Sequence, residues 1–290
     1  MEPPNGTMTQ ATLPVPTDGA RSRWSWALTA GISALVVWSA LGTRVEPSTI
    51  LSVETLLAVV EYIARAFPPD LSSSFLAEVG SGVIETLAIS VSGTFVAIVT
   101  GACLAVFAAR TVVFGSIGDD GNTRFWLRAL LTSTYLAART MLSLLRTVPE
   151  MVWALLFVFA VGLGPFPGVL ALGVHTAGVL GKLFSEVFED VSSRPLEALQ
   201  SCGASRITMF AYGVLPQALP QCIAYSLYRW EVSIRAAAIL GFVGAGGLGQ
   251  QIHLAINLFF EHQLLTLVAA IYVTVTIVDA LSTALRRSLR

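Results

Sequence analysis

Ionisable side chains occur inside two of the most apolar stretches of this sequence. One stretch carries His175 and Lys182, and another carries Arg229, Glu231 and Arg235. A charge near the centre of a bilayer costs roughly 2.5 to 3.5 kcal/mol on insertion scales, so these side chains must face protein or water. Glu231 and Arg235 are four residues apart with the acid first, which favours an intrahelical ion pair. Such a pair can fix helix packing or form part of a polar path.

Arg229 has no such partner in its own stretch. We therefore interpret Arg229 as a cation that lines a path for an anionic solute, with Arg235, His175 and Lys182 as further candidates. His175 and Lys182 are seven residues apart and share a helix face, and Lys182 precedes Glu186 by four. For a single histidine, a hydrogen bond in helix packing is the competing interpretation.

The sequence lacks the residue sets of several other chemistries. A nucleotide-binding P-loop requires GxxxxGK[ST], but Lys182 is the only lysine and is followed by Leu183. The glycines at 244, 246 and 249 formally satisfy GxGxxG, yet they follow an apolar span, whereas a dinucleotide site follows a strand. His175, His253 and His262 are too scattered to predict a catalytic or metal centre. The chain is therefore not predicted to be an enzyme or to bind a metal or cofactor itself.

The elements that position these residues are predicted to be membrane helices. Of 290 residues, 54% are hydrophobic and only 12% are charged, and the mean hydropathy is +0.73. Soluble domains carry about 25% charged residues. The net charge of −1 gives no reason to expect a nucleic-acid partner. The predicted fold is all-α, a multi-pass membrane protein with about six transmembrane helices.

Charged residues between the apolar stretches predict the topology. The positive-inside bias places Arg21, Arg23 and the C-terminal arginines in the cytoplasm. Six crossings then put both termini inside. Residues 127–145 are interpreted as the cytoplasmic or slanted start of one long helix. The predicted spans are 24–43, 83–109, 148–161, 169–184, 217–242 and 264–285.

Composition divides the chain into three segments. Residues 1–20, rich in Pro, Thr and Gly, predict a disordered cytoplasmic tail. Residues 21–80 predict a first transmembrane helix and an acidic external segment, with an amphipathic helix around 51–67. Residues 81–290 predict the main transmembrane domain. Its segment 186–216 is too polar to lie in lipid and is predicted to be a cytoplasmic loop.

That loop contains a spaced motif. It begins with Glu197-Ala198, Gly203 lies six positions after Glu197, and Pro216 of the pair Leu215-Pro216 lies thirteen positions after Gly203. Glu197 in the first turn of a helix would complement its positive end. Gly203 would permit a sharp turn or a close backbone approach, and Leu215-Pro216 would end the element before the next span. The pattern predicts a helix–turn–helix that docks in a groove of another protein. A plain hairpin between two spans is the alternative.

The spacing resembles the EAA motif of ABC importer permeases, in which Glu-Ala-Ala is followed by Gly and by Ile-x-Leu-Pro. Two positions depart from that motif, because Leu199 replaces the second Ala and Gly213 replaces the Ile. Four further runs between 145 and 251 look like the phosphonate permease family, whereas the first eighty residues add nothing. These runs are Arg146–Glu150, His175–Lys182, Leu227–Val232 and Gly241–Gly249.

The resemblance implies the type I ABC importer (MetI-like) fold and a role as the permease subunit for phosphonate or a related phosphorus oxyanion. It also implies that the chain lies in the lipid bilayer of the bacterial cytoplasmic membrane. The implied protein partners are a dimer of ATP-binding cassette ATPases that carries ATP and Mg²⁺, a second permease chain, which is identical or paralogous, and an external solute-binding protein. The residues that would couple to the ATPase are Glu197, Ala198, Gly203, Leu215 and Pro216. Phosphate, phosphite and methionine are rival solutes, and a secondary transporter is the rival class, although no internal repeat supports it.

Overall fold

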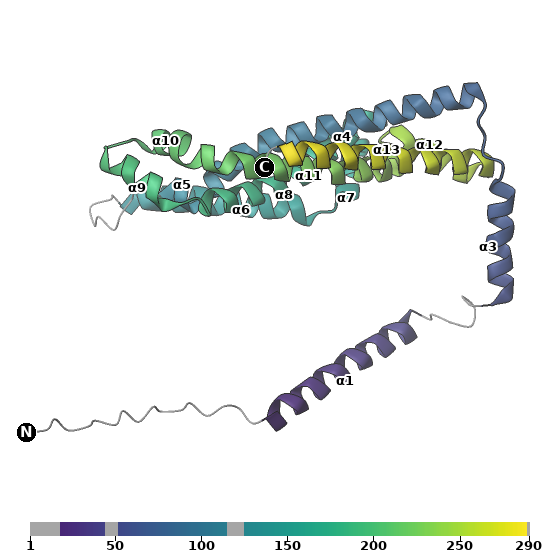
Figure 1. The fold of residues 1–290 in the computed structure, drawn as a ribbon, viewed down its shortest axis with the longest axis horizontal. Coiled ribbons are helices and arrows are strands. Elements are labelled where there is room, and N and C mark those ends of the chain that lie inside the picture. Colours follow the sequence, from purple (N-terminus) through teal and green to yellow (C-terminus); the bar gives the residue numbers. More distant parts are fainter. Residues whose placement is uncertain (1–17, 44–51, 115–124, 289–290) are drawn as a thin grey trace, which may run out of the picture. The chain divides into compact units, whose positions relative to one another are not determined.

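The structure, a computed structural model, describes residues 18–43, 52–114 and 125–288, and within these ranges it contains helices and no strand. The chain forms two units, residues 1–63 and 64–290. Its α-helices, labelled in Figure 1, are α1 (Asp18–Gly42), α3 (Val53–Ala66), α4 (Ser73–Ala108), α5 (Arg110–Phe114), α6 (Phe125–Thr147), α7 (Glu150–Val161), α8 (Pro165–Glu189), α9 (Ser193–Ser201), α10 (Arg206–Met209), α11 (Leu215–Leu240), α12 (Gly247–Asn257) and α13 (Glu261–Ser288).

The first unit contains α1 and most of α3. Every side chain from 25 to 43 is exposed, including Trp26 and Trp38 at more than 70%. A helix that is apolar on all sides requires a lipid or protein environment, which agrees with the predicted first span. Helix α1 begins at Asp18, inside the predicted tail 1–20, and the remainder of that tail lies outside the described residues. Helix α3 matches the amphipathic helix predicted around 51–67.

Among the described residues, four helices are long and apolar enough to cross a membrane, namely α1, α4, α8 and α13. Two bent pairs raise this number to six if each pair forms one span: α6 with α7, and the stretch from Arg206 to Val243 with α12. About six spans were expected from the sequence, and the structure confirms this. Helix α4 starts ten residues before the predicted span at 83, so residues 73–80 of the predicted external segment are helical.

Residues 127–161 do not form the single long helix that the sequence predicts. Helices α6 and α7 meet at an angle of 89° across Val148 and Pro149. Proline cannot donate to the preceding turn and disfavours helical geometry in the residue before it, which explains the break at this point. The break leaves helix carbonyls at the end of α6 that need other partners.

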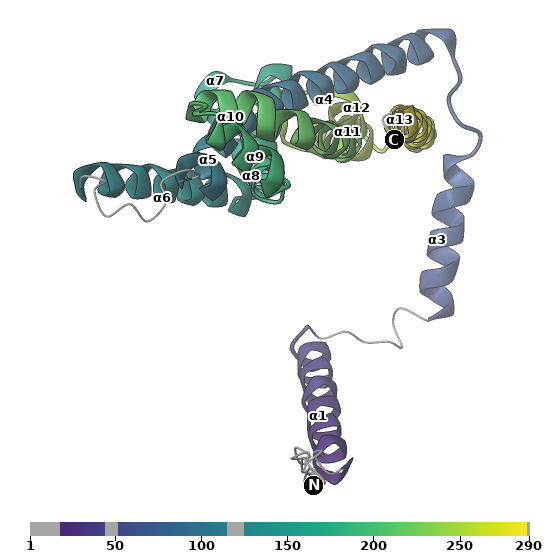
Figure 2. The same cartoon turned by 60° about the vertical axis from the view of Figure 1, so that its left-hand side comes forward.

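The second unit is built around α4 and α8, which run in the same direction. Gly93 of α4 faces Leu172 of α8, and eight residues later Gly101 faces Ala177 and Gly181. Helix α6 runs the opposite way, because Gly178 and Gly181 of α8 face Arg146 and Leu142 respectively. In Figure 2, α4 extends to the right of this region and α6 to the left. The alternating directions agree with the predicted order of inward and outward spans.

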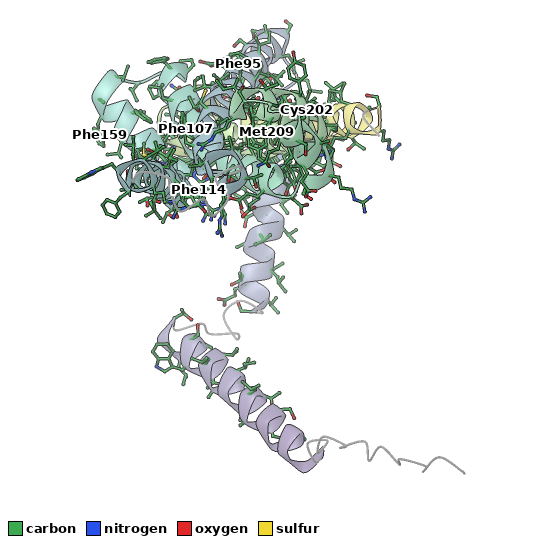
Figure 3. The ribbon with its side chains drawn as sticks, turned by 90° about the vertical axis from the view of Figure 1, so that its left-hand side faces the viewer. Phe95, Phe107, Phe114, Phe159, Cys202 and Met209 are labelled. Atoms are coloured by element: carbon green, nitrogen blue, oxygen red, sulfur yellow. The ribbon has the colours of Figure 1, made fainter. Side chains whose placement is uncertain are left out.

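Small residues fill the core of the second unit, and large apolar side chains cover its outside. Alanines make up most of two core clusters, for example Ala105 and Ala177 in one and Ala171 in the other, and a few larger side chains pack among them. By contrast, Phe95 of α4 and Phe159 of α7 are 66% and 86% exposed, and both point away from the bundle in Figure 3. This inverted distribution is typical of helices that pack closely on one another and face lipid on the outside. Helices α9 and α10 form one end of the unit, the loop end (Figure 1).

Candidate coupling loop and translocation path

Helix α9 presents the Glu-Ala pair at the loop end. Glu197 and Ala198 are exposed, and within the described residues the Glu197 carboxylate forms no ion pair. The expectation that Glu197 lies in the first helical turn is wrong, because α9 begins at Ser193 and its first turn contains no acid. Glu197 therefore does not offset the helix dipole, and its carboxylate is free for a partner outside the chain.

Gly203 makes the turn that follows α9. Its φ of +76° lies in the left-handed region that glycine adopts without penalty. A Cβ at this position would meet no atom within 4 Å. Of the two expectations for Gly203, the structure therefore supports the sharp turn and not the close backbone approach. After the turn, the Ser205 hydroxyl accepts from the Thr208 backbone N–H and caps α10.

Leu215 and Pro216 do not end the element, as the sequence analysis expects, but begin α11. A π-helical turn (Phe210–Val214) joins α10 to α11 without leaving helical geometry. Pro216 has no backbone N–H to donate to the preceding turn, and the π-helical turn before it accommodates this loss. The amide Nε2 of Gln217 donates to the Gly213 carbonyl at 2.5 Å and satisfies a carbonyl at this irregular step.

Two apolar side chains at the loop end were missed by the sequence analysis. Ile207 of α10 is 81% exposed and Tyr212 of the π segment is 76% exposed. Single exposed apolar residues are common on protein surfaces, so these two side chains mark a binding surface only together with the exposed Glu197 and Ala198 of the same loop. The sequence signal was weak, because single apolar residues in a charged loop have no periodicity.

A cavity of about 660 Å³ lies beside this loop, between the last turns of α8 and the first turns of α11. Its charged lining is acidic and comprises Glu186, Glu189 and Asp190, with Gln217 and Gln221 opposite. Three carboxylates so close together repel an anion, so this cavity does not favour an anionic solute.

Glu189 joins three helices at the loop end. Its Oε1 accepts from the backbone N–H of Arg110 at 2.7 Å and from the Arg139 guanidinium at 2.9 Å. Arg139 also donates to the Ala108 carbonyl and lies over the Tyr135 ring. The C-terminal ends of α4 and α8 and the middle of α6 are thereby tied together, a few residues before α9 begins.

His175 lies against the break between α6 and α7. Its Nδ1 is 3.0 Å from the Val148 carbonyl oxygen, which can only accept, so Nδ1 carries a proton. Its Nε2 is 3.6 Å from the carboxylate of Glu150 at the start of α7. The indole of Trp153 donates to the Leu145 carbonyl at the same break. His175 thus has a packing role at the break. Its partner Glu150 lies in a run quoted for the resemblance but was not predicted as a site residue.

Arg229 lies on α11 and is partly buried. Its Nε is fully buried and has no hydrogen-bond partner in the part of the chain that the structure describes. The carboxylate of Glu150 is near enough to attract the guanidinium. The indole N–H of Trp230 and the hydroxyl of Ser233 are likewise buried without a partner among the described residues. Ser233 is one helical turn from Arg229, so both face the same side of α11.

Arg235 belongs to an ion-pair network between α11 and α13. Glu231 contacts Arg235 at 3.0 Å and Arg286 at 2.9 Å, and Arg235 lies 3.8 Å from Asp279. The predicted pair of Glu231 and Arg235 is confirmed. Lys182 likewise contacts Glu186 at 3.2 Å, as its spacing suggests. Arg235 therefore lies on the side of α11 that faces α13. Lys182 lies on α8, two helical turns after His175.

The glycine run 241–249 makes a tight turn between α11 and α12. Gly244, Gly246 and Gly247 all have positive φ. A Cβ on Gly249 would overlap the Ala238 carbonyl, so the two helices approach through this glycine. Glu85 of α4 accepts from the Gly247 N–H at 2.9 Å, and the Thr86 hydroxyl accepts from the Leu248 N–H at 2.9 Å. These contacts cap α12 with side chains that lie 162 residues earlier in the chain, so the spacing of residues in the sequence could not predict them.

Comparison with known proteins agrees with this architecture. Residues 128–290 match the family described as binding-protein-dependent transport system inner membrane component. The phosphite transport system permease protein PtxC of Stutzerimonas stutzeri is 34% identical over 90% of this chain and 87% of its own length. The phosphate-import permease protein PhnE of Mycolicibacterium smegmatis is 34% identical over 80% of this chain, but over only 40% of its own length.

Among solved structures, the permease fold of the MetNI methionine ABC transporter in an inward-facing conformation matches 76% of this chain and all of that chain, with a TM-score of 0.61 and 20% identity. At that identity the likeness concerns the fold alone. It agrees with the predicted MetI-like arrangement of helices. The chain therefore belongs to the family of inner membrane components of binding-protein-dependent transport systems.

Proposed function

We propose that this chain forms the translocation path for a phosphorus oxyanion (phosphonate, phosphite or phosphate) in an ATP-driven importer. The observation that carries the proposal is the partly buried Arg229, whose Nε has no partner and whose neighbours Trp230 and Ser233 offer further unsatisfied donors. Buried donors are normally hydrogen-bonded, so the unsatisfied donors of Arg229 and Ser233, which share one face of α11, suit a transient anionic guest. The phosphite and phosphate named for PtxC and PhnE support this class of solute.

Glu150 has a defined part in this proposal. It attracts Arg229 and lies 3.6 Å from His175. A carboxylate beside the cation keeps the empty path electrostatically balanced, and it weakens the hold on a passing anion. The solute is then bound briefly here, while the external binding protein provides the selectivity.

The loop end provides the contact with the partner ATPase, which binds ATP and Mg²⁺. Support comes from the exposed Glu197 and Ala198, the turn at Gly203, and the exposed Ile207. Leu215 and Pro216 join this contact rigidly to α11, and therefore to Arg229, through one continuous helix. On this proposal the loop end is cytoplasmic, both termini are cytoplasmic, and a second permease chain completes the path.

The test is uptake into proteoliposomes that contain the chain with its ATPase, its second permease chain and ATP inside, and the binding protein outside. Labelled phosphate, phosphite, methylphosphonate and methionine are compared. We expect ATP-dependent uptake of at least one phosphorus oxyanion and none of methionine. Uptake of methionine, or oxyanion uptake that continues without the ATPase, would overturn the proposal.

A further inference from the structure

A second cavity, of about 230 Å³, lies between α6 and α8 and gathers three cations. Its polar lining comprises Arg139, Ser143, Arg146, Lys182, Ser185 and Glu186. Residues 139, 143 and 146 are spaced by four and three, so they share one face of α6. Lys182 and Ser185 share a face of α8 for the same reason. Two helix faces that carry cations and hydroxyls therefore converge on one space, the α6/α8 cavity.

Glycines of α8 bring the two faces together. A Cβ on Gly178 would lie 2.6 Å from the backbone nitrogen of Arg146, and a Cβ on Gly181 would overlap the Leu142 side chain. Any larger residue would push α6 away from α8. The close approach next to Lys182 is therefore built into the sequence Gly-Val-Leu-Gly-Lys.

The cations of the cavity are not fully neutralised. Lys182 contacts Glu186 at 3.2 Å, and Arg139 contacts Glu189 at 2.9 Å. Arg146 forms no ion pair within the described residues. Three cations thus face one lining carboxylate, the reverse of the acidic 660 Å³ cavity that Glu186 also borders.

We propose that the α6/α8 cavity holds a phosphorus oxyanion at a second station, nearer the loop end than Arg229. The identity of the ion as cargo rests on the proposed function. The fork of Arg146 suits a tetrahedral oxyanion, Lys182 supplies a point charge, and the Ser143 hydroxyl can donate to one of its oxygens. The Ser185 hydroxyl already donates to the Lys182 carbonyl at 2.8 Å, so it lines the cavity without supplying a donor. Sites for drug-sized ligands have volumes of about 300–1,000 Å³. The α6/α8 cavity is smaller than this, as suits a small ion. A phospholipid head group carries the same chemistry, so the test must separate the two sources.

The experiment measures equilibrium binding of ³²P-labelled phosphate to the full-length chain in nanodiscs of pure phosphatidylcholine. We expect saturable binding that weakens about tenfold in Arg146→Gln, as for the loss of a charged hydrogen bond, and recovers in part in Arg146→Lys. Arg287→Gln removes the same charge from an exposed position on α13 and should bind like the parent. A Lys182→Gln variant repeats the test from the other helix, in case one substitution prevents folding.

A second arm adds phosphatidylglycerol and counts retained lipids by native mass spectrometry. Retained lipid that is lost in Arg146→Gln, without binding of free phosphate, would assign the cavity to a head group and overturn its role for cargo. Phosphate binding that is absent, or equally weakened by Arg287→Gln, would also overturn it. Phosphate binding in this assay together with failed oxyanion uptake in proteoliposomes would uphold the cavity and overturn only the proposed function.

Discussion

At the scale of single residues, two acids of the second unit, Glu231 and Glu189, each meet more than one positive or donor group. Glu231 contacts two arginines, and Glu189 accepts from Arg139 and from a backbone N–H. Arg229 differs because its Nε is buried and unsatisfied among the described residues. Leaving such a donor unpaired costs about 1–3 kcal/mol, and a passing anion could recover that energy.

Arg229→Ala should therefore lower maximal uptake by about tenfold or more while the amount of assembled complex stays normal. Solute capture by the binding protein should not change, because that step precedes entry into the membrane. Complex yield and uptake are measured on the same reconstituted variants. Arg229→Gln preserves much of the shape but not the charge, and full uptake by that variant at normal yield would contradict an anion path.

The stability effects of removing Arg235 and of removing Glu231, the two partners of one ion pair, are predicted to differ. The sequence suggests that loss of Arg235 strands Glu231, but Arg286 at 2.9 Å remains as a second partner. Arg235→Ala should thus cost at most about 1 kcal/mol, as for a partly exposed ion pair. Glu231→Ala removes the shared acid from both arginines and should cost more, up to about 3–5 kcal/mol. Thermal unfolding in detergent measures both, and equal losses would show that the network does not depend on Glu231.

At the scale of elements, composition and apolar runs predicted most of the fold. The first apolar helix, the amphipathic helix and the helix–turn–helix around Gly203 all occur near their predicted residues. The break before Glu150 was missed because a proline can either kink or end a helix, and packing decides which. Contacts of His175 with Glu150, and of Glu85 with Gly247, could not be predicted, since they join residues that only the tertiary fold brings together.

The turn at Gly203 gives a prediction for the coupling loop. Gly203→Val should strain the backbone, because a φ of +76° costs a residue with a Cβ roughly 1–2 kcal/mol. We expect normal membrane insertion but ATP hydrolysis that no longer drives uptake. Gly203→Asn, which tolerates this conformation better, should keep more coupling. The ratio of ATP hydrolysed to solute transported measures the effect, and a Gly203→Val complex that couples like the parent would exclude a docking role for this turn.

The approach of α11 and α12 through Gly249 gives a second prediction at this scale. Gly249→Ala should reduce the yield of folded protein strongly, because the added methyl group overlaps the Ala238 carbonyl. Gly80→Ala is the matched control, since Gly80 lies in α4 and its Cβ would meet nothing within 4 Å. That control should be neutral or stabilising by up to about 1 kcal/mol. Yield after size-exclusion chromatography distinguishes the two, and similar yields would show that the α11–α12 turn adapts.

At the scale of the whole molecule, the helix directions restrict the topology. Helices α4 and α8 run in parallel, and α6 runs against them, so the loop end collects the ends of α4 and α8 and the start of α11. Whichever side of the membrane holds α9 must therefore also hold the polar residues 185–212. The arginines around this end, including Arg110, Arg139 and Arg206, favour the cytoplasm by the positive-inside bias.

Cysteine labelling checks this orientation. Cys103, Cys202 and Cys222 are first replaced, and single cysteines are then placed at Ser73, Ser205 or Ser288. An impermeant thiol reagent added to intact cells should label the position at Ser73, which begins α4 at the end opposite α9. Positions 205 and 288 should react only after the membrane is opened, because both lie on the predicted cytoplasmic side. All three positions are exposed, so burial alone does not protect them. Labelling of position 205 in intact cells would invert the assignment, and it would place the proposed ATPase contact on the wrong side of the membrane.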